Sequence, residues 1–167
     1  MARRVQIRPD DTTGYWRELT ALWGAGGDLV VVEQDVELHR TVLSQFRRCP
    51  EPWCVFPYNG PGYGGADGGD PTISGALGCV RFRAALMATH PGLMADVGNV
   101  DDAPGLGRGD WRRLDVRVLG ALRDQGRIPH IHTPPVCHHH RYHDLCACGT
   151  EHEPYPVDRE GRYAPEG

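Results

Sequence analysis

Lysine is absent from this sequence of 167 residues, and all 18 basic side chains are arginines. The absence excludes mechanisms that depend on a lysine amine, such as a Schiff base or the phosphate-binding lysine of a P-loop. No run approaches the roughly 20 consecutive apolar residues that a membrane helix needs. The formal charge of −4 excludes a protein that holds nucleic acid by bulk positive charge, although a local arginine patch could still contact it. We therefore expect a cytoplasmic protein that has no membrane partner and forms one compact domain.

Disulfides are not expected for the six cysteines, because the amino terminus has charges but no apolar leader segment. Cys49, Cys54 and Cys79 are scattered and are expected to pack in the core. The others lie near histidines, and one tetrahedral set could hold a structural Zn²⁺: Cys137, His143, Cys146 and Cys148. A polar tail with incidental thiols is the alternative for this segment. The predicted division is a domain over residues 1–140 and a polar tail over residues 141–167 that could bind zinc.

Hydrophobic periodicity predicts alternating strands and helices along the first third of the chain. A short strand at Val5–Arg8 precedes a helix at Tyr15–Trp23. The β-branched run Leu29–Val32 is typical of a strand buried on both faces, and a second helix is predicted over Val36–Arg48. This order indicates an α/β fold with a parallel sheet.

Further elements are predicted downstream: strands at 53–58 and 76–82, helices at 84–89 and 110–122, and an extended run at 127–136. The glycine-rich segment 59–69 is predicted to be a loop, either a mobile cover over a site or a plain surface connection. Arg81 and Arg83 could contact a diphosphate, and a solvated surface pair is the alternative.

Two acids one residue apart, Glu33 and Asp35, follow the apolar strand. In an extended chain alternate side chains share a face, so both carboxylates could serve one divalent cation and its ligand. The alternative is that Asp35 caps a helix that begins just after it. The pattern therefore predicts either a metal site at a strand end or a helix cap.

The order of these features resembles the glycosyltransferases of the GT-A fold. The D-x-D type motif of that family, whose acids bind a divalent metal and the ribose diphosphate, corresponds here to Glu33-Gln34-Asp35. The resemblance implies that Asp35 is the metal ligand and that Glu33 contacts the ribose or the outer sphere of the metal. It also implies a compact, Rossmann-like mixed sheet flanked by helices and a nucleoside diphosphate sugar as the donor.

Three later segments extend the resemblance. Residues 75–82 are similar to the small-residue strand that precedes the acceptor-side helix of the family. Residues 109–115 are similar to the segment with an acid for acceptor binding or base catalysis, which implies that role for Asp115, with Asp110 second. Residues 129–138 resemble the end of the catalytic domain, where a histidine completes the metal shell, and here that histidine would be His138 or His140.

The chemistry of sugar transfer explains why these residue types are gathered. Mn²⁺ or Mg²⁺ bound by carboxylates can neutralise the charge that builds on the departing diphosphate, and one imidazole ligand favours Mn²⁺. If the reaction inverts the sugar, a carboxylate such as Asp115 must take the proton of the acceptor hydroxyl. The sequence does not identify the acceptor, which could be a nucleic acid base or a protein.

The chain departs from the family before Glu33, where members usually have several strand–helix units that form the nucleotide pocket. A reduced pocket could use Arg8, Asp10 or Asp11 near the base or ribose, and a second subunit could complete it in a homodimer. A hypothesis from another class is a zinc-stabilised binding module without enzymatic activity. In that module residues 33–35 are only a strand end and a helix cap.

Overall fold

The computed structural model describes residues 5–8, 10–34, 36–59, 77–98, 109 and 114–138, of which 59, 137 and 138 are described through their backbone. These residues form five helices and seven short strands, so the coarse expectation of a mixed α/β fold is confirmed. Within this part of the chain, no helix combines the length and the apolar character needed to cross a membrane.

The central sheet has four strands in the order β1 (Leu29–Val32), β5 (Cys79–Phe82), β3 (Trp53–Val55) and β6 (His130–Ile131). β5 is antiparallel to both of its neighbours, whereas β3 and β6 are parallel. β1, β3 and β6 therefore share one direction, and β5 is inserted between β1 and β3 in the reverse direction. The expectation of a mixed sheet is therefore confirmed, and the parallel sheet indicated by the order of strands and helices is wrong because of this one inserted strand.

A smaller sheet continues the same three chain paths, in the order β2 (Val36–Glu37), β7 (Val136–His138) and β4 (Tyr58–Asn59). β2 follows β1, β4 follows β3 and β7 follows β6, each after a short break. Backbone hydrogen bonds span the breaks, from the N–H of Phe56 to the carbonyl of Cys79 and from the N–H of Val136 to the carbonyl of Pro57. Pro57 lies in a break, where its missing N–H removes no bond from a strand ladder.

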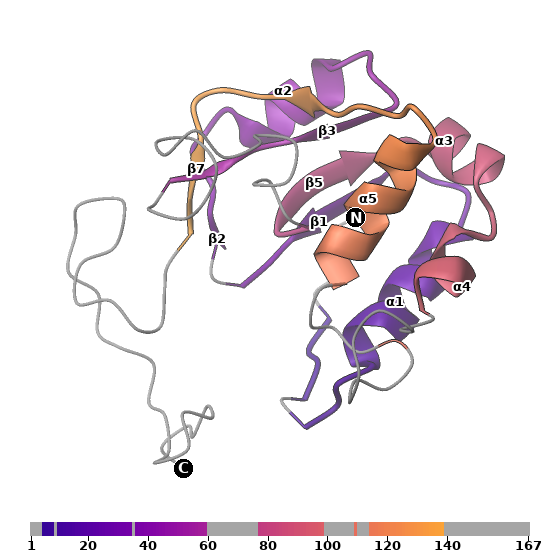
Figure 1. Cartoon of the computed structure of the whole chain (residues 1–167). Coiled ribbons are helices and arrows are strands. Elements are labelled where there is room, and N and C mark those ends of the chain that lie inside the picture. The colour runs from indigo at the N-terminus through magenta and orange to yellow at the C-terminus, as the bar shows by residue number, and fades with distance from the viewer. Residues whose placement is uncertain are drawn as a thin grey trace, which may run out of the picture.

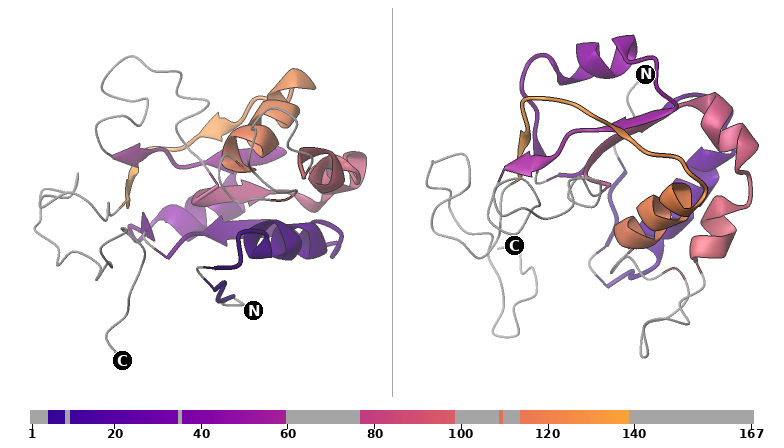
Figure 2. Two further views of the ribbon diagram at one scale, coloured as in Figure 1. Left: turned by 60° about the horizontal axis from the view of Figure 1, so that its bottom comes forward. Right: turned by 45° about the horizontal axis from the view of Figure 1, so that its top comes forward.

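Helices cover both faces of the central sheet (Figures 1 and 2). One face carries α1 (Gly14–Trp23), α3 (Ala84–Thr89), α4 (Leu93–Val97) and α5 (Leu114–Asp124), and the other carries α2 (Val42–Arg48). Successive strand residues serve opposite faces: Trp53 and Val55 of β3 join the larger core, and Cys54 joins the smaller core beneath α2. Because both faces are covered here, all three residues of β3 are buried and apolar.

The two tryptophans of α1 fix this helix to the rest of the larger core. They are seven residues apart, which places them on one side of the helix. The indole N–H of Trp16 donates to the carbonyl of Met94 at 2.6 Å, and that of Trp23 donates to the carbonyl of His90 at 3.0 Å. Trp23 also packs on Phe82 of β5, with ring centroids 5.1 Å apart. α1 is therefore held to both the sheet and the segment around α4.

Several predicted elements are confirmed and others are corrected. The strand Leu29–Val32 and the helices at 15–23 and 84–89 are confirmed to within one residue. No strand forms over residues 5–8, and α4 had not been predicted. The helix expected from Val36 begins only at Val42, because Val36 and Glu37 form β2 and pair with β7.

Candidate functional site

Glu33 lies at the end of β1 and is held by two neighbours. Its backbone N–H donates to the carbonyl of Gly78 at 2.9 Å, which extends the pairing of β1 with β5 by one residue. Its half-buried carboxylate accepts a hydrogen bond at Oε1 from the hydroxyl of Tyr15 on α1, at 3.1 Å. The acid therefore has a fixed orientation, which a solvated strand end would not give.

Gly78 makes room for this carboxylate and for a second tyrosine. A Cβ atom built on Gly78 would lie 1.6 Å from the hydroxyl oxygen of Tyr58 and 2.8 Å from Oε2 of Glu33. Both polar groups therefore lie directly against the backbone of Gly78. Tyr58 therefore belongs to the surroundings of Glu33.

The pKa of Tyr15 responds to the charges of Glu33 and of the acid expected to act as a base. Burial raises the pKa of Tyr15 well above its usual value, and the charge and hydrogen bond of Glu33, followed by the charges of Tyr58 and Asp115, raise it further. Asp115 lies half-buried in the first turn of α5, and α1 and α5 cover the same face of the sheet (Figure 1). Tyr15 remains protonated at neutral pH, so its hydroxyl can donate to Glu33.

The chain turns directly after Glu33. The N–H of Val36 donates to the carbonyl of Glu33 at 3.2 Å, so the chain turns between the end of β1 and the start of β2. Asp35 lies outside the described residues, so the shared face of Glu33 and Asp35 stays a prediction. The helix-cap alternative is wrong, because the next helix begins at Val42 and its N-cap is Thr41.

The backbone of His138 lies beside this turn. In the antiparallel pairing of β2 with β7, Val36 is opposite His138 and Glu37 is opposite Cys137. The register therefore places the main chain of an expected metal-binding histidine next to the residue that follows Asp35. Asp35, Asp110 and His140 lie outside the described residues, as do His143, Cys146 and Cys148 of the predicted zinc set.

The three residues proposed for a reduced nucleotide pocket are paired locally. Arg8 contacts Asp10 through two hydrogen bonds of 3.2 and 3.1 Å, and both side chains are largely exposed. Asp11 accepts hydrogen bonds from Arg17 and Thr13, and the guanidinium of Arg17 lowers the pKa of Asp11 below its usual range. Asp11 thereby links the preceding segment to α1, and a nucleotide would have to compete with the arginine partners of both acids.

A second cluster was not recognised in the sequence. Cys49, Cys54 and His132 are buried, and one ligand atom from each lies within 4.8 Å of the others. The expectation that Cys49, Cys54 and Cys79 pack in the core is confirmed. The spacing of Cys49 and Cys54 was a signal, but the third member is 78 residues further along the chain and no local pattern indicates it.

Arg81 lies beside this cluster and is buried, so the expectation of a solvated arginine pair is wrong. It is 2% exposed, and its guanidinium donates to the carbonyls of Phe46, Cys49 and Glu51 at 2.7, 3.0 and 2.6 Å. These carbonyls belong to the last turn of α2 and the residues after it, where a positive charge is favourable. Arg83 is half-buried, contacts the carbonyl of Cys49 and pairs with Asp28.

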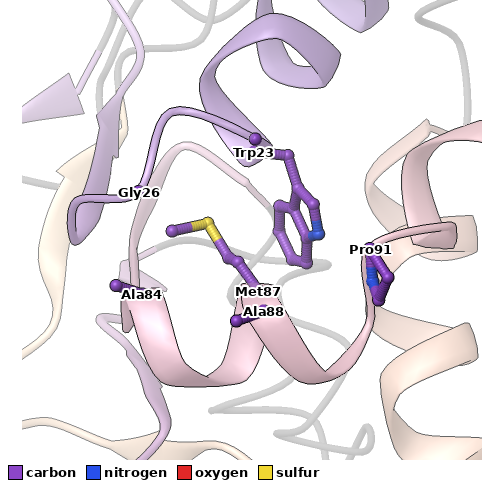
Figure 3. A pocket seen from close by; sticks show the side chains of 7 residues that line it. Trp23, Gly26, Ala84, Met87, Ala88 and Pro91 are labelled. Atoms are coloured by element: carbon purple, nitrogen blue, oxygen red, sulfur yellow. The ribbon is translucent and has the colours of Figure 1, made fainter.

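A shallow hollow of about 220 Å³ opens at the other end of α1. Trp23 and Met87 line it together with Gly24, Gly26, Ala84, Ala88 and Pro91 (Figure 3). None of these side chains is titratable or nucleophilic, so the hollow offers no group for catalysis or metal binding. Trp23 is eight residues from Tyr15 along the helix, a distance of about 12 Å, and the hollow is therefore separate from the surroundings of Glu33.

Comparison with protein-family models, with curated proteins and with solved structures found no match for this chain.

Proposed function

We propose that this chain is a metal-dependent glycosyltransferase that takes a sugar from a nucleoside diphosphate. The observation that carries the proposal is the hydrogen bond that orients Glu33, which comes from Tyr15 on a helix that packs on the same face of the sheet as α5. Tyr15 donates a hydrogen bond to Glu33, and the charge of Asp115 raises its pKa. These acids are the two to which the resemblance assigns donor binding and base catalysis.

The register of the smaller sheet gives further support. The backbone of His138 lies opposite Val36, one residue after Asp35. Carboxylate and imidazole ligands from these two neighbouring strands would suit Mn²⁺ or Mg²⁺, with Mn²⁺ preferred because of the nitrogen donor. Asp35 and His138 would hold the cation, with Glu33 and His140 as further candidates. A bound divalent cation would supply charge neutralisation for the departing diphosphate.

The residues around Glu33 would then have distinct tasks. Glu33, whose orientation is held by the hydrogen bond from Tyr15, would accept a hydrogen bond from a ribose hydroxyl or a metal-bound water. Asp115 would take the proton of the acceptor hydroxyl if the transfer inverts the sugar. Tyr58 beside Gly78 would limit the space next to the carboxylate and so restrict the position of the donor.

Calorimetric titration tests donor binding. The purified chain is titrated with UDP and with GDP, with and without Mn²⁺, beside Asp35→Ala and the control Asp124→Ala, which alters an exposed acid at the end of α5. We expect metal-dependent binding of one nucleotide that the control keeps and Asp35→Ala loses. Absence of binding for both nucleotides would refute the proposal as stated.

The role of Asp115 is tested separately by Asp115→Asn. We expect the release of UDP or GDP from a panel of sugar nucleotides to slow by about 10²-fold or more, because a positioned base contributes at least that factor. Nucleotide affinity should stay unchanged. An unaltered rate would exclude Asp115 as the base and would leave a retaining reaction.

The rival zinc-stabilised binding module instead predicts no nucleotide binding and an effect of Asp35→Ala on stability alone.

A further inference from the structure

The smaller core contains a set of ligands that the proposed transferase does not use. Cys49 follows the last turn of α2, Cys54 is the central residue of β3, and His132 follows β6. Their ligand atoms lie within 4.8 Å of one another. Ligands at metal–sulfur bond lengths of about 2.3 Å are separated by about 3.8 to 4.0 Å, so an ion needs only a small inward movement of these side chains.

His132 is prepared to act as a ligand. It is 6% exposed, and among the described residues its buried Nε2 has no hydrogen-bond partner. Such an unpaired buried nitrogen normally costs free energy. Its ring is stacked on Phe56, with centroids 4.7 Å apart, and meets the edge of Phe46, so its orientation is fixed. Burial lowers the pKa of His132 to about 4, with a further contribution from His130, so the imidazole is neutral at pH 7.

We propose that Cys49, Cys54 and His132 form a buried three-ligand site for one thiophilic cation, and that Cu⁺ is the ion that fits it best. Thiolate and imidazole are soft or borderline ligands, which excludes Mg²⁺ and Ca²⁺. Each cysteine releases its thiol proton to solvent when the metal–sulfur bond forms, so binding of one ion frees two protons. No change of oxidation state is involved. The site is independent of the cation of the proposed transferase.

Coordination number and charge both favour Cu⁺. Structural Zn²⁺ almost always has four ligands, whereas Cu⁺ is stable with three. Two thiolates and Cu⁺ carry a net charge of −1, which the guanidinium of Arg81 would balance. This guanidinium contacts the carbonyl of Cys49, and within the described part of the chain no carboxylate pairs with it. Two thiolates and Zn²⁺ would be neutral and would leave the charge of Arg81 unbalanced.

The test uses the full chain with Cys137→Ser, Cys146→Ser and Cys148→Ser, so that ions on the predicted carboxyl-terminal set are not counted. Cu⁺ is titrated without oxygen against a coloured Cu⁺ chelator, and Zn²⁺ is titrated separately. Two further variants remove a ligand, Cys54→Ala and His132→Gln. Cys79→Ala is the matched control, because Cys79 is also a fully buried β-strand cysteine but lies outside the cluster. Circular dichroism identifies the variants that remain folded.

We expect one Cu⁺ per chain in the parent and in Cys79→Ala, with two sulfur atoms and one nitrogen around copper by X-ray absorption. Either ligand variant should bind at least about 100-fold more weakly, since even outer-sphere changes cost up to that factor. Absence of stoichiometric binding would overturn the site, as would unchanged affinity in a folded ligand variant. Binding of Zn²⁺ with rejection of Cu⁺ would overturn the assignment of the ion. If Cys54→Ala unfolds, His132→Gln decides the outcome, because it keeps both thiols.

Discussion

Replacement of Gly78 by alanine should destabilise the protein and disturb Glu33. The added Cβ would lie 1.6 Å from the hydroxyl oxygen of Tyr58 and 2.8 Å from Oε2 of Glu33, and neither separation is possible between unbonded atoms. Relief requires both side chains to move. Overpacking of this kind costs about 1 to 3 kcal/mol, and the bond from Tyr15 to Glu33 would add about 1 kcal/mol if it is lost. We therefore expect a loss of about 2 to 4 kcal/mol in the free energy of unfolding.

Urea unfolding followed by tryptophan fluorescence measures this loss, and Gly120→Ala is its control. Gly120 lies inside α5, and a Cβ there would meet no atom within 4 Å. Alanine at this position should stabilise the protein by about 0.5 to 1 kcal/mol, because glycine is the poorer helix former. The two glycine-to-alanine changes should thus have opposite signs.

A double variant identifies the cause of the destabilisation. Tyr58→Phe removes the oxygen that lies closest to the new methyl group, so Tyr58→Phe with Gly78→Ala should be less destabilised than the sum of the two single changes. An unfolding midpoint of Gly78→Ala equal to that of the parent would show that the three groups are not in contact. If the effects of Tyr58→Phe and Gly78→Ala are strictly additive, the destabilisation by Gly78→Ala does not come from its contact with the hydroxyl of Tyr58.

Four further changes test the core, the site and the buried histidine. Leu122→Ala, in a fully buried position of α5, should cost about 2 to 5 kcal/mol in urea unfolding, whereas Leu43→Ala, which is 59% exposed on α2, should change stability by less than about 0.5 kcal/mol. Tyr15→Phe should cost about 1 to 3 kcal/mol, because Glu33 would lose its donor, and an unchanged midpoint would mean that water replaces the hydroxyl without cost. For metal-free protein, the free energy of unfolding should fall as the pH drops from about 6.5 to about 4. The pKa of His132 is about 6.5 in the unfolded chain and about 4 in the folded protein, so in this range the unfolded state binds a proton that the folded state does not. Unfolding midpoints across this range should show the decline, and His132→Gln should flatten it.

The local parts of the fold were predictable from the sequence. Leu29–Val32 is a run of apolar residues and forms β1 as predicted, but the expectation that both of its faces are buried is wrong, since Val30 and Val32 are about 40% exposed. The helix around Trp16, Leu19 and Trp23 was equally clear, since these apolar residues recur on one helical side. In both segments the neighbouring residues alone determine the structure.

The errors arose where a distant segment determines the structure. Val36 and Glu37 could have begun a helix, but β7 pairs with them about a hundred residues later in the chain. Arg81 was judged from its charge, and its burial depends on carbonyls at the end of α2, which lie more than thirty residues earlier. No spacing rule links such segments, because their contact depends on how the whole sheet assembles.

The candidate sites also divide into residues with a local signal in the sequence and residues that only the fold brings together. Glu33 was selected because an acid after an apolar strand is a local signal, and Asp115 because its segment resembles the acid-bearing segment of the glycosyltransferases; both roles stay predictions. Tyr15 was missed, since a tyrosine at the start of a helix has no local feature that points to Glu33. The grouping of Cys49, Cys54 and His132 also needed the fold, because it depends on the parallel pairing of β3 with β6.

The position of β1 at the edge of the central sheet has a consequence for self-association. In its antiparallel pairing with β5, the backbone groups of alternate residues point away from the sheet, and Val30 and Val32 are also about 40% exposed. Such an edge can recruit a strand of another molecule and start aggregation. The acids at either end of this four-residue strand, Asp28 and Glu33, shorten the apolar stretch and act as gatekeepers. Neutralising both should therefore lower the solubility of the folded protein, quite apart from any effect on catalysis.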